Sequence, residues 1–262
     1  MMPRKKSKLL VSAILLVLAG LVTLIFIQSR RPNELPSSVL GVSSSTPALT
    51  GNVKVETSKN ETADYQTEVN IPQFENPGDS FALQHINKQI KDNVGQLVMN
   101  FTEEIQQIKT ESPDSPFNDP SLPKHSLMIK VASAKEVSGK YFVVELKDYS
   151  YVSGSAHPFT ATIAYNFDLK TGDLIGLSDI YKDKAQFLQA VSTFAKKELQ
   201  PKLESFFEDG ISPQEQNFSV YTLVEGGIRF VFDQYQVAPY AAGEQSVTVP
   251  ASALAGQLKI AL

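Results

Sequence analysis

The chain has 262 residues, of which 42% are hydrophobic, and its formal net charge at pH 7 is −4. It contains no cysteine, which excludes a disulfide framework, a thiolate zinc site, a cysteine nucleophile and a lipoprotein anchor. All 28 acidic residues but only 18 of the 24 basic residues follow Arg31, so residues 32–262 carry a net charge of −10. Such a surface argues against nucleic acid as a partner. It favours a cationic partner or simply keeps an exported domain soluble.

The first element is an uncharged stretch, Leu9–Ile27, whose nineteen residues nearly span the hydrocarbon core of a bilayer. Four basic residues precede it and two follow it, which favours a cytoplasmic N-terminus and an extracytoplasmic C-terminus. We therefore predict a single-pass signal anchor in the cell membrane, behind a cytoplasmic stub of residues 1–8. The alternative, a cleaved signal peptide, usually has a shorter apolar core that ends in small residues.

A segment rich in Ser, Pro and Thr, residues 28–51, follows the predicted anchor and contains little that could be buried. Its composition predicts a disordered linker between the membrane and the outer domain. We expect the outer domain to have two halves, a strand–helix half at 52–125 and an α+β half at 126–262.

In the first half, two short strands are predicted at Val53–Val55 and Tyr65–Ile71, with Pro72 ending the second. Apolar residues then recur every three or four positions from Ile86 to Ile108, which predicts a long amphipathic helix. Asp79 or Ser80 would cap this helix, which would end before Pro113.

The second half alternates apolar and polar residues, which predicts strands over 127–131, 142–146, 160–167 and 247–249 and a hairpin over 220–232 that turns at Gly226-Gly227. A turn is expected at Asp168–Asp173, with Gly172 at positive φ. A second amphipathic helix is predicted from Ala185 to Phe207, kinked or divided at Pro201. The fold class expected is α+β, with antiparallel sheets packed against two long amphipathic helices, preceded by one transmembrane helix.

Most catalytic signatures are absent from the sequence, which has no phosphate-binding, dinucleotide-binding, zinc-protease or G-x-S-x-G motif. Ser121–Lys124 and Lys170–Gly172 fit two motifs of penicillin-binding enzymes, but Pro123 and the missing S-D-N motif argue against that interpretation. The three histidines are scattered, and we expect neither a metal nor a cofactor. One enzymatic alternative remains: a wall hydrolase or esterase that uses His157 with Ser153 or Ser155, and Asp168 as a third member. The residue types alone are common, and no oxyanion-hole element is evident.

Two segments place tyrosines beside small residues and a proline: Tyr149–Pro158 and Tyr235–Gly243. Tyrosine offers a broad amphipathic contact at low entropic cost, and small neighbours allow a partner to approach. The sequence is equally consistent with an interface and with tyrosines packed over tight turns.

These segments belong to a set of blocks that resembles a known family. The blocks are Ser153–Pro158, Asn166–Gly172, Leu177–Tyr181, Phe232–Gly243 and Val247–Pro250. Together they are similar to the extracytoplasmic domain of RsiV-type, lysozyme-sensing anti-sigma factors, over about residues 52–260. A similar domain occurs as the non-catalytic module of a membrane-anchored bacterial peptidoglycan deacetylase. The pattern Tyr-x-Val-Ala-Pro-Tyr-Ala-x-Gly carries most of the resemblance.

The resemblance implies a ligand surface that includes Ser153, Pro239 and Tyr240. With the neighbouring polar and aromatic side chains, the candidate partner interface is Ser153, Ser155, His157, Tyr235, Pro239 and Tyr240. This chain departs from the family in having only eight residues before the apolar stretch, so we do not expect it to hold a sigma factor. It also has Ser155 where the family pattern leads us to expect a second glycine, and it shows no metal-dependent catalytic domain.

We therefore expect a non-enzymatic module of the bacterial cell envelope, anchored in the membrane through residues 9–27. Its expected ligand is a lysozyme-like protein or peptidoglycan itself. The sequence predicts no oligomeric state.

Overall fold

The computed structural model describes residues 47–49 and 51–262. The predicted anchor and most of the predicted linker lie outside these residues. Within the described part of the chain, no helix is both long enough and apolar enough to cross a membrane. The described residues form one compact unit that contains two sheets.

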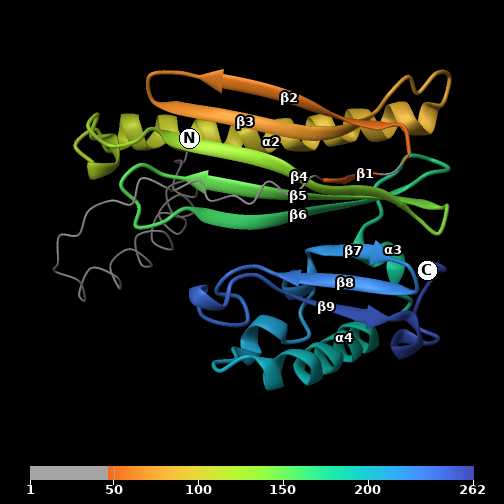
Figure 1. Ribbon diagram of the computed structural model, residues 1–262. Helices are drawn as coiled ribbons and strands as arrows, with labels where there is room; N and C mark the ends of the chain where they lie inside the picture. Colours follow the sequence, from red (N-terminus) through yellow and green to blue (C-terminus); the bar gives the residue numbers. More distant parts are fainter. Residues whose placement is uncertain (1–46, 50) are drawn as a thin grey trace, which may run out of the picture. The chain divides into compact units, whose positions relative to one another are not determined.

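The larger sheet has six strands in the order β2-β3-β4-β5-β6, with the short β1 beside β4 (Figure 1). The strands are β1 (Ala48–Leu49), β2 (Val53–Glu61), β3 (Tyr65–Phe74), β4 (His125–Val137), β5 (Tyr141–Tyr151) and β6 (Phe159–Asp168). Strand β4 runs parallel to both β1 and β3, whereas the other pairs are antiparallel. The prediction of purely antiparallel sheets is therefore wrong for this sheet. The helix between β3 and β4 returns the chain to the end where β3 begins, and the two strands therefore run in parallel.

Helix α2 (Phe81–Glu111) lies along the larger sheet (Figure 1). Its predicted apolar side chains are buried against the strands, among them Ile86, Ile90 and Ile105. The Ser80 side chain accepts a hydrogen bond from the Leu83 N–H at the first turn, a cap of the kind that contributes about 1 kcal/mol. The predicted helix and its end are confirmed.

Strand β3 continues through Pro72 to Phe74, so the prediction that Pro72 ends it is wrong. The pairing of β3 with β4 stops at Val69, whereas its pairing with β2 extends to Phe74. Pro72 therefore lies where β3 has a partner on one side only, and its missing N–H leaves no ladder bond unmade.

The smaller sheet is fully antiparallel and consists of β7 (Tyr221–Val224), β8 (Gly227–Phe232) and β9 (Gln245–Pro250). The predicted hairpin is confirmed, with Gly226 at φ +70° in its turn. Helix α4 (Lys184–Leu199) packs on this sheet and is followed by a short 3-10 turn that contains Pro201. The helix therefore ends at the proline instead of reaching Phe207. The remaining helical segments are short: α3 (Leu177–Ile180), η1 (Pro116–Asn118), η2 (Gln200–Lys202), η3 (Glu208–Ile211), η4 (Glu215–Phe218), η5 (Tyr240–Ala242) and η6 (Ala251–Leu254).

Strand β5 serves both hydrophobic cores, because alternate residues of a strand point to opposite faces. Phe142 and Val144 join the core beneath α2, whereas Tyr141 and Val143 join the core of α4 and the smaller sheet. The two sheets are also joined by the buried Asn166 on β6, whose side chain bonds to the backbone of β7. Its Nδ2 donates to the Tyr221 carbonyl at 3.0 Å, and its Oδ1 accepts from the Leu223 N–H at 2.8 Å.

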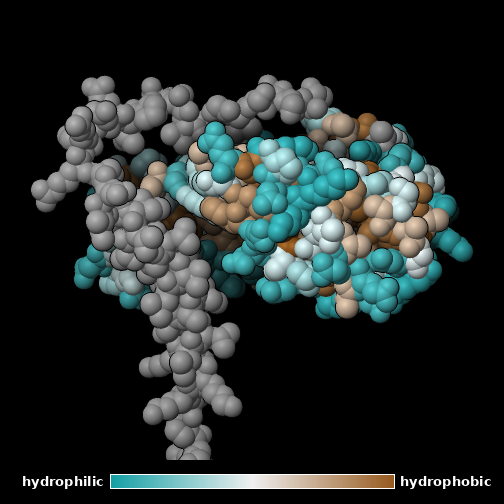
Figure 2. All heavy atoms as spheres, turned by 90° about the horizontal axis from the view of Figure 1, so that it is seen from below, coloured by the Kyte–Doolittle hydropathy of each residue, from teal (hydrophilic) through white to brown (hydrophobic). Residues whose placement is uncertain are grey.

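The outer surface is mostly hydrophilic on the face seen from below, where hydrophobic residues form patches broken up by polar ones (Figure 2). A few large side chains are exposed on the described part, including Phe81 at 73%, Phe159 at 53% and Tyr235 at 45%. Phe159 and Tyr235 lie in or beside the two tyrosine-rich segments singled out in the sequence.

Candidate functional site

The candidate site forms where two loops meet. The histidine loop (Val152–Pro158) connects β5 to β6, and the tyrosine loop (Asp233–Glu244) connects β8 to β9 (Figure 1). The rings of His157 and Tyr240 lie 4.3 Å apart between centroids at an interplanar angle of 33°. The ring centroids of Tyr235 and Tyr240 lie 5.5 Å apart. The two segments singled out in the sequence are therefore neighbours in space.

The histidine loop is shaped by hydrogen bonds to its own backbone and to one buried histidine. The Ser155 hydroxyl donates to the Val152 carbonyl at 2.6 Å, and the Ser153 N–H donates to Nδ1 of His125 at 3.0 Å. Burial lowers the pKa of His125, which keeps its ring neutral and able to accept this bond. Gly154 has φ +82° and lies against Phe117, so a side chain at this position would be both strained and crowded.

The middle of the tyrosine loop is buried and anchored. Val237 and Ala238 are almost fully buried, and the Val237 carbonyl accepts a hydrogen bond from the Phe207 N–H at 2.9 Å. The Gln236 amide donates to the carbonyls of Gly210 and Asn217, at 3.0 and 2.9 Å. This anchoring leaves the residues on either side, Tyr235 and Pro239, at the surface.

Gly210 lies so close to the tyrosine loop that no other residue fits without movement. A Cβ atom at this position would be 1.9 Å from the Gln236 carbonyl oxygen, far inside van der Waals contact. Tyr235 itself has φ +69°, a left-handed conformation that is uncommon for a residue with a side chain. The contacts on both sides of Tyr235 hold the backbone in this conformation.

The two ends of the tyrosine loop are attached to the same residue of β6, the buried Thr162. The Thr162 N–H donates to Oδ1 of Asp233 at 3.1 Å, at the start of the loop. The Thr162 hydroxyl donates to Oε2 of Glu244, at the end of the loop. Lys147 on β5 completes this arrangement, since its Nζ lies 2.6 Å from the same Glu244 oxygen and 2.6 Å from the Thr162 hydroxyl.

A network of half-buried charges surrounds this attachment. Arg229 on β8 pairs with Glu145 at 2.6 Å, and Lys147 lies 3.4 Å from Glu145. Burial, together with the nearby Asp233, raises the pKa of Asp148 to about 6. One carboxylate oxygen of Asp148 is buried without a hydrogen-bond partner among the described residues. The pKa of Asp233 is also raised, chiefly by burial.

The six predicted interface residues differ in their exposure. Ser153 is buried at 3% exposure, whereas Ser155, His157 and Tyr240 are half-buried and Tyr235 and Pro239 are exposed. The structure thus brings five of them to the surface, and Ser153 lies beneath as a support of the loop. Rigid aromatic rings of this kind offer contact area at low entropic cost. The role of these six residues in binding stays a prediction.

The geometry does not assemble a Ser-His-Asp set. The Ser155 hydroxyl is engaged by backbone, and Nδ1 of His157 faces the Pro158 carbonyl at 3.0 Å. Asp168 pairs with Tyr141 at the opposite end of β6 and accepts the Lys170 N–H in a turn, at 2.7 Å. The interpretation of Asp168 as a partner of His157 is therefore wrong. Within residues 47–49 and 51–262, no group of three acidic or histidine side chains is arranged to hold a metal ion.

Sequence reasoning missed the residues that position the tyrosine loop: Lys147, Thr162, Asp233 and Glu244. A signal for two of them was present, because Asp233 and Glu244 flank a run of ten uncharged residues. Nothing in the sequence indicated that both would reach the same threonine, since Thr162 lies 71 residues before Asp233 and 82 before Glu244.

Comparisons with known proteins agree with this fold. Residues 178–252, from α3 to the start of η6, match the family model described as "Protein of unknown function (DUF3298)". The chain is 27% identical over 217 residues to "Peptidoglycan-N-acetylmuramic acid deacetylase PdaC" of Bacillus subtilis (strain 168). The match covers 80% of this chain but 42% of that protein, so the chain spans less than half the length of this relative.

Two crystal structures share the fold at low sequence identity. A DUF3298 family protein from Pseudomonas aeruginosa PAO1 matches with a TM-score of 0.53 and 15% identity, over 79% of this chain and 94% of that one. A member of the same family from Bacteroides fragilis NCTC 9343 matches with a TM-score of 0.56 and 18% identity, over 80% and 95%. The chain is therefore related to a peptidoglycan deacetylase, shares the fold of two solved DUF3298 proteins, and matches the family model over the segment that carries the tyrosine loop.

Proposed function

We propose that this chain is a non-enzymatic binding module of the bacterial cell envelope, anchored in the membrane through residues 9–27. Its two-loop surface, made of Ser155, His157, Tyr235, Pro239 and Tyr240, recognises a cell-wall-associated ligand, in the first place a lysozyme-like protein. The contact between His157 and Tyr240 carries the proposal, because it joins two motif segments into one surface.

Three further observations support this function. The relative at 27% identity acts on peptidoglycan, as its name states. Residues 32–262 carry a net charge of −10, which favours a cationic partner such as lysozyme. The tyrosine loop is held at both ends and in its middle, so its surface residues are positioned before a partner arrives, and this lowers the entropic cost of binding.

Calorimetric titration of the full chain in detergent with c-type lysozyme, at low and moderate salt, tests the proposal. We expect binding at micromolar concentration or tighter that weakens as salt rises, because exposed charges are screened. Tyr240→Ala should weaken it about tenfold, the loss expected for an aromatic contact residue of an interface.

Phe81→Ala is the matched control, because Phe81 is an exposed aromatic residue outside the two loops. Its removal should leave the affinity unchanged. Equal affinities for the wild type and Tyr240→Ala would contradict the proposed surface, and no binding at either salt concentration would remove lysozyme as the ligand.

The hydrolase alternative rests on His157 with Ser153 or Ser155. It is less well supported, since neither serine hydroxyl reaches the histidine ring in the described hydrogen-bond network. Turnover of wall fragments or of a model ester that disappears in His157→Ala would nevertheless establish it.

A further inference from the structure

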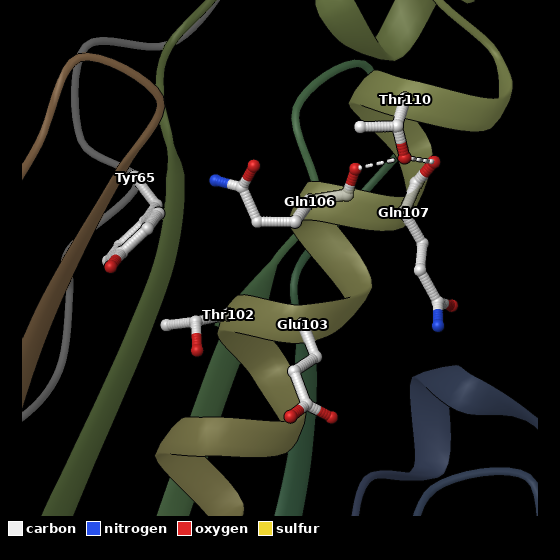
Figure 3. Close-up of a pocket in the computed structure, with 6 residues that line it drawn as sticks. All are labelled: Tyr65, Thr102, Glu103, Gln106, Gln107 and Thr110. Carbon is white, nitrogen blue, oxygen red and sulfur yellow. Dashed lines mark hydrogen bonds between the residues drawn. The ribbon is translucent and has the colours of Figure 1, made fainter.

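A second surface feature lies away from the two loops. A hollow of about 420 Å³ separates the first residue of β3 from the last turns of α2. Its lining consists of one aromatic residue and five polar ones: Tyr65, Thr102, Glu103, Gln106, Gln107 and Thr110 (Figure 3). Figure 3 shows Thr102 and Gln106 extending from the helix toward the side on which Tyr65 lies.

The Tyr65 ring is held in place by the core. It packs edge-on against the buried Phe101, with centroids 6.1 Å apart and an interplanar angle of 85°. The ring is only half-buried, so part of it remains free at the hollow. A fixed aromatic ring at a surface offers an apolar face for stacking at low entropic cost.

The polar groups of the hollow are available for a ligand. Within the described residues, the side chains of Glu103, Gln106 and Gln107 form no hydrogen bond or ion pair with other groups. The two amides together supply donors and acceptors, and the carboxylate supplies acceptors. The hydroxyls of Thr102 and Thr110 donate to the backbone, which leaves their oxygen lone pairs free to accept.

The lining also excludes several classes of ligand. No lysine or arginine lines the hollow, and the nearby Lys109 is paired with Asp64 at 2.7 Å, so a phosphate would find no cation. The polar lining likewise provides little area for a wholly apolar ligand. A neutral molecule with many hydroxyl groups and an apolar ring face fits both the tyrosine and the amides.

We propose that this hollow binds a short segment of carbohydrate chain, with one sugar ring stacked on Tyr65 and the hydroxyl groups of the chain bonded to Gln106, Gln107 and Glu103. The lining from Thr102 to Thr110 extends for about 12 Å along the helix axis, so an elongated ligand can contact several of its side chains at once. The assignment to an N-acetylated sugar of peptidoglycan rests on the proposed function. The carbohydrate site itself is argued from the lining of the hollow alone.

The hollow lies at the same end of the larger sheet as the histidine loop. Tyr65 pairs with His125 in the β3–β4 register, and His125 accepts the hydrogen bond from the Ser153 N–H. A glycan strand and a protein partner would therefore bind at one end of the domain, through different residues.

The test is an NMR titration of the full chain in detergent with the tetramer of N-acetylglucosamine, with cellotetraose as the comparison sugar. We expect chemical-shift changes at the hollow that saturate at millimolar concentration or below. Tyr65→Ala should weaken binding about tenfold, and Gln106→Ala about threefold, as expected for one lost hydrogen bond. Gln96→Ala is the matched control, since Gln96 is an exposed glutamine on the same helix outside the hollow, and it should bind like the wild type.

The absence of saturable shifts with both sugars would overturn the proposal. Equal effects of Gln96→Ala and Gln106→Ala on sugar affinity would overturn it as well. The Gln106 side chain is exposed, so we expect Gln106→Ala to fold like the wild type, and a loss of binding cannot be attributed to misfolding. Binding of both sugars with the same affinity would support the carbohydrate site and remove the assignment to N-acetylated sugars. Lysozyme titration of Gln106→Ala separates the two proposals, because it should match the wild type whether or not the sugar binds.

Discussion

The two loops of the candidate site are held in different ways. The histidine loop is shaped by bonds within the loop, such as that from the Ser155 hydroxyl to the Val152 carbonyl, and by one bond to His125, 28 residues before Ser153. The tyrosine loop depends on groups far away in the sequence: Lys147 and Thr162 at its ends and Gly210 at its middle. The comparison shows that the proposed binding surface combines a loop held mostly by its own hydrogen bonds with a loop held mostly by residues far away in the sequence. The second should therefore be the more sensitive to mutation and to pH.

The largest effect is expected for Gly210→Ala. The added methyl group would meet the Gln236 carbonyl oxygen, so the backbone of the tyrosine loop or of η3 must move. We expect a loss of about 3 kcal/mol in the free energy of unfolding, measured by urea denaturation. Gly95→Ala is the control, because Gly95 lies in α2 with open space around it. Alanine there should stabilise the protein by about 1 kcal/mol. Equal stabilities of Gly210→Ala and the wild type would show that the loop is not held through its middle.

Lys147→Met should have the next largest effect. Removing the ammonium group leaves the half-buried carboxylates of Glu145 and Glu244 with Arg229 as their one remaining shared cation among the described residues, and Arg229 lies 3.9 Å from Glu244. We expect a loss of about 2 kcal/mol in unfolding free energy, because breaking a partly buried pair costs more than an exposed one. Lys88→Met, which removes an exposed pair with Asp92, should cost less than about 0.5 kcal/mol. A cost for Lys147→Met no larger than this control would contradict the role of Lys147 at the end of the loop.

The pH dependence of stability should report on Asp148. Its pKa is raised in the folded state to about 6 from an ordinary value of 3.8, so the folded protein binds this proton more tightly than the unfolded chain. Stability should therefore fall as the pH rises from about 4 through 6, by at most about 3 kcal/mol. Asp148→Asn removes this loss, so the variant should be more stable than the wild type at pH 7.5. Lowering the pH to 4 should raise the free energy of unfolding of the variant less than that of the wild type. A difference between the two proteins that does not change with pH would show that the pKa of Asp148 is the same in the folded and the unfolded protein.

The smallest effect is expected in the histidine loop. Ser155→Ala removes one hydroxyl bond to the Val152 carbonyl, which still accepts the Ser155 N–H at 3.0 Å. We expect a cost of about 0.5 kcal/mol in unfolding free energy and no change in its pH dependence. A cost as large as that of Lys147→Met would remove the contrast between the two loops.

Much of the fold could be predicted from local pattern. The recurrence of apolar residues predicted α2, and Ser80 and Gly226 marked a cap and a turn where the structure has them. These features depend on side chains within a few positions of one another. Pro72 shows the limit of such reasoning, because a proline ends a strand only where its N–H would have had a partner.

The sequence alone determined that the chain has a long amphipathic helix, a set of alternating strands, no cysteine chemistry and two segments rich in tyrosine and small residues. Only the tertiary structure decided that the larger sheet is mixed, that His157 meets Tyr240, and that Thr162 joins both ends of the tyrosine loop. Periodicity and caps act over a few residues and can be read along the chain. Strand order and the pairing of buried charges depend on contacts between distant residues, which exist only once the sheets have formed.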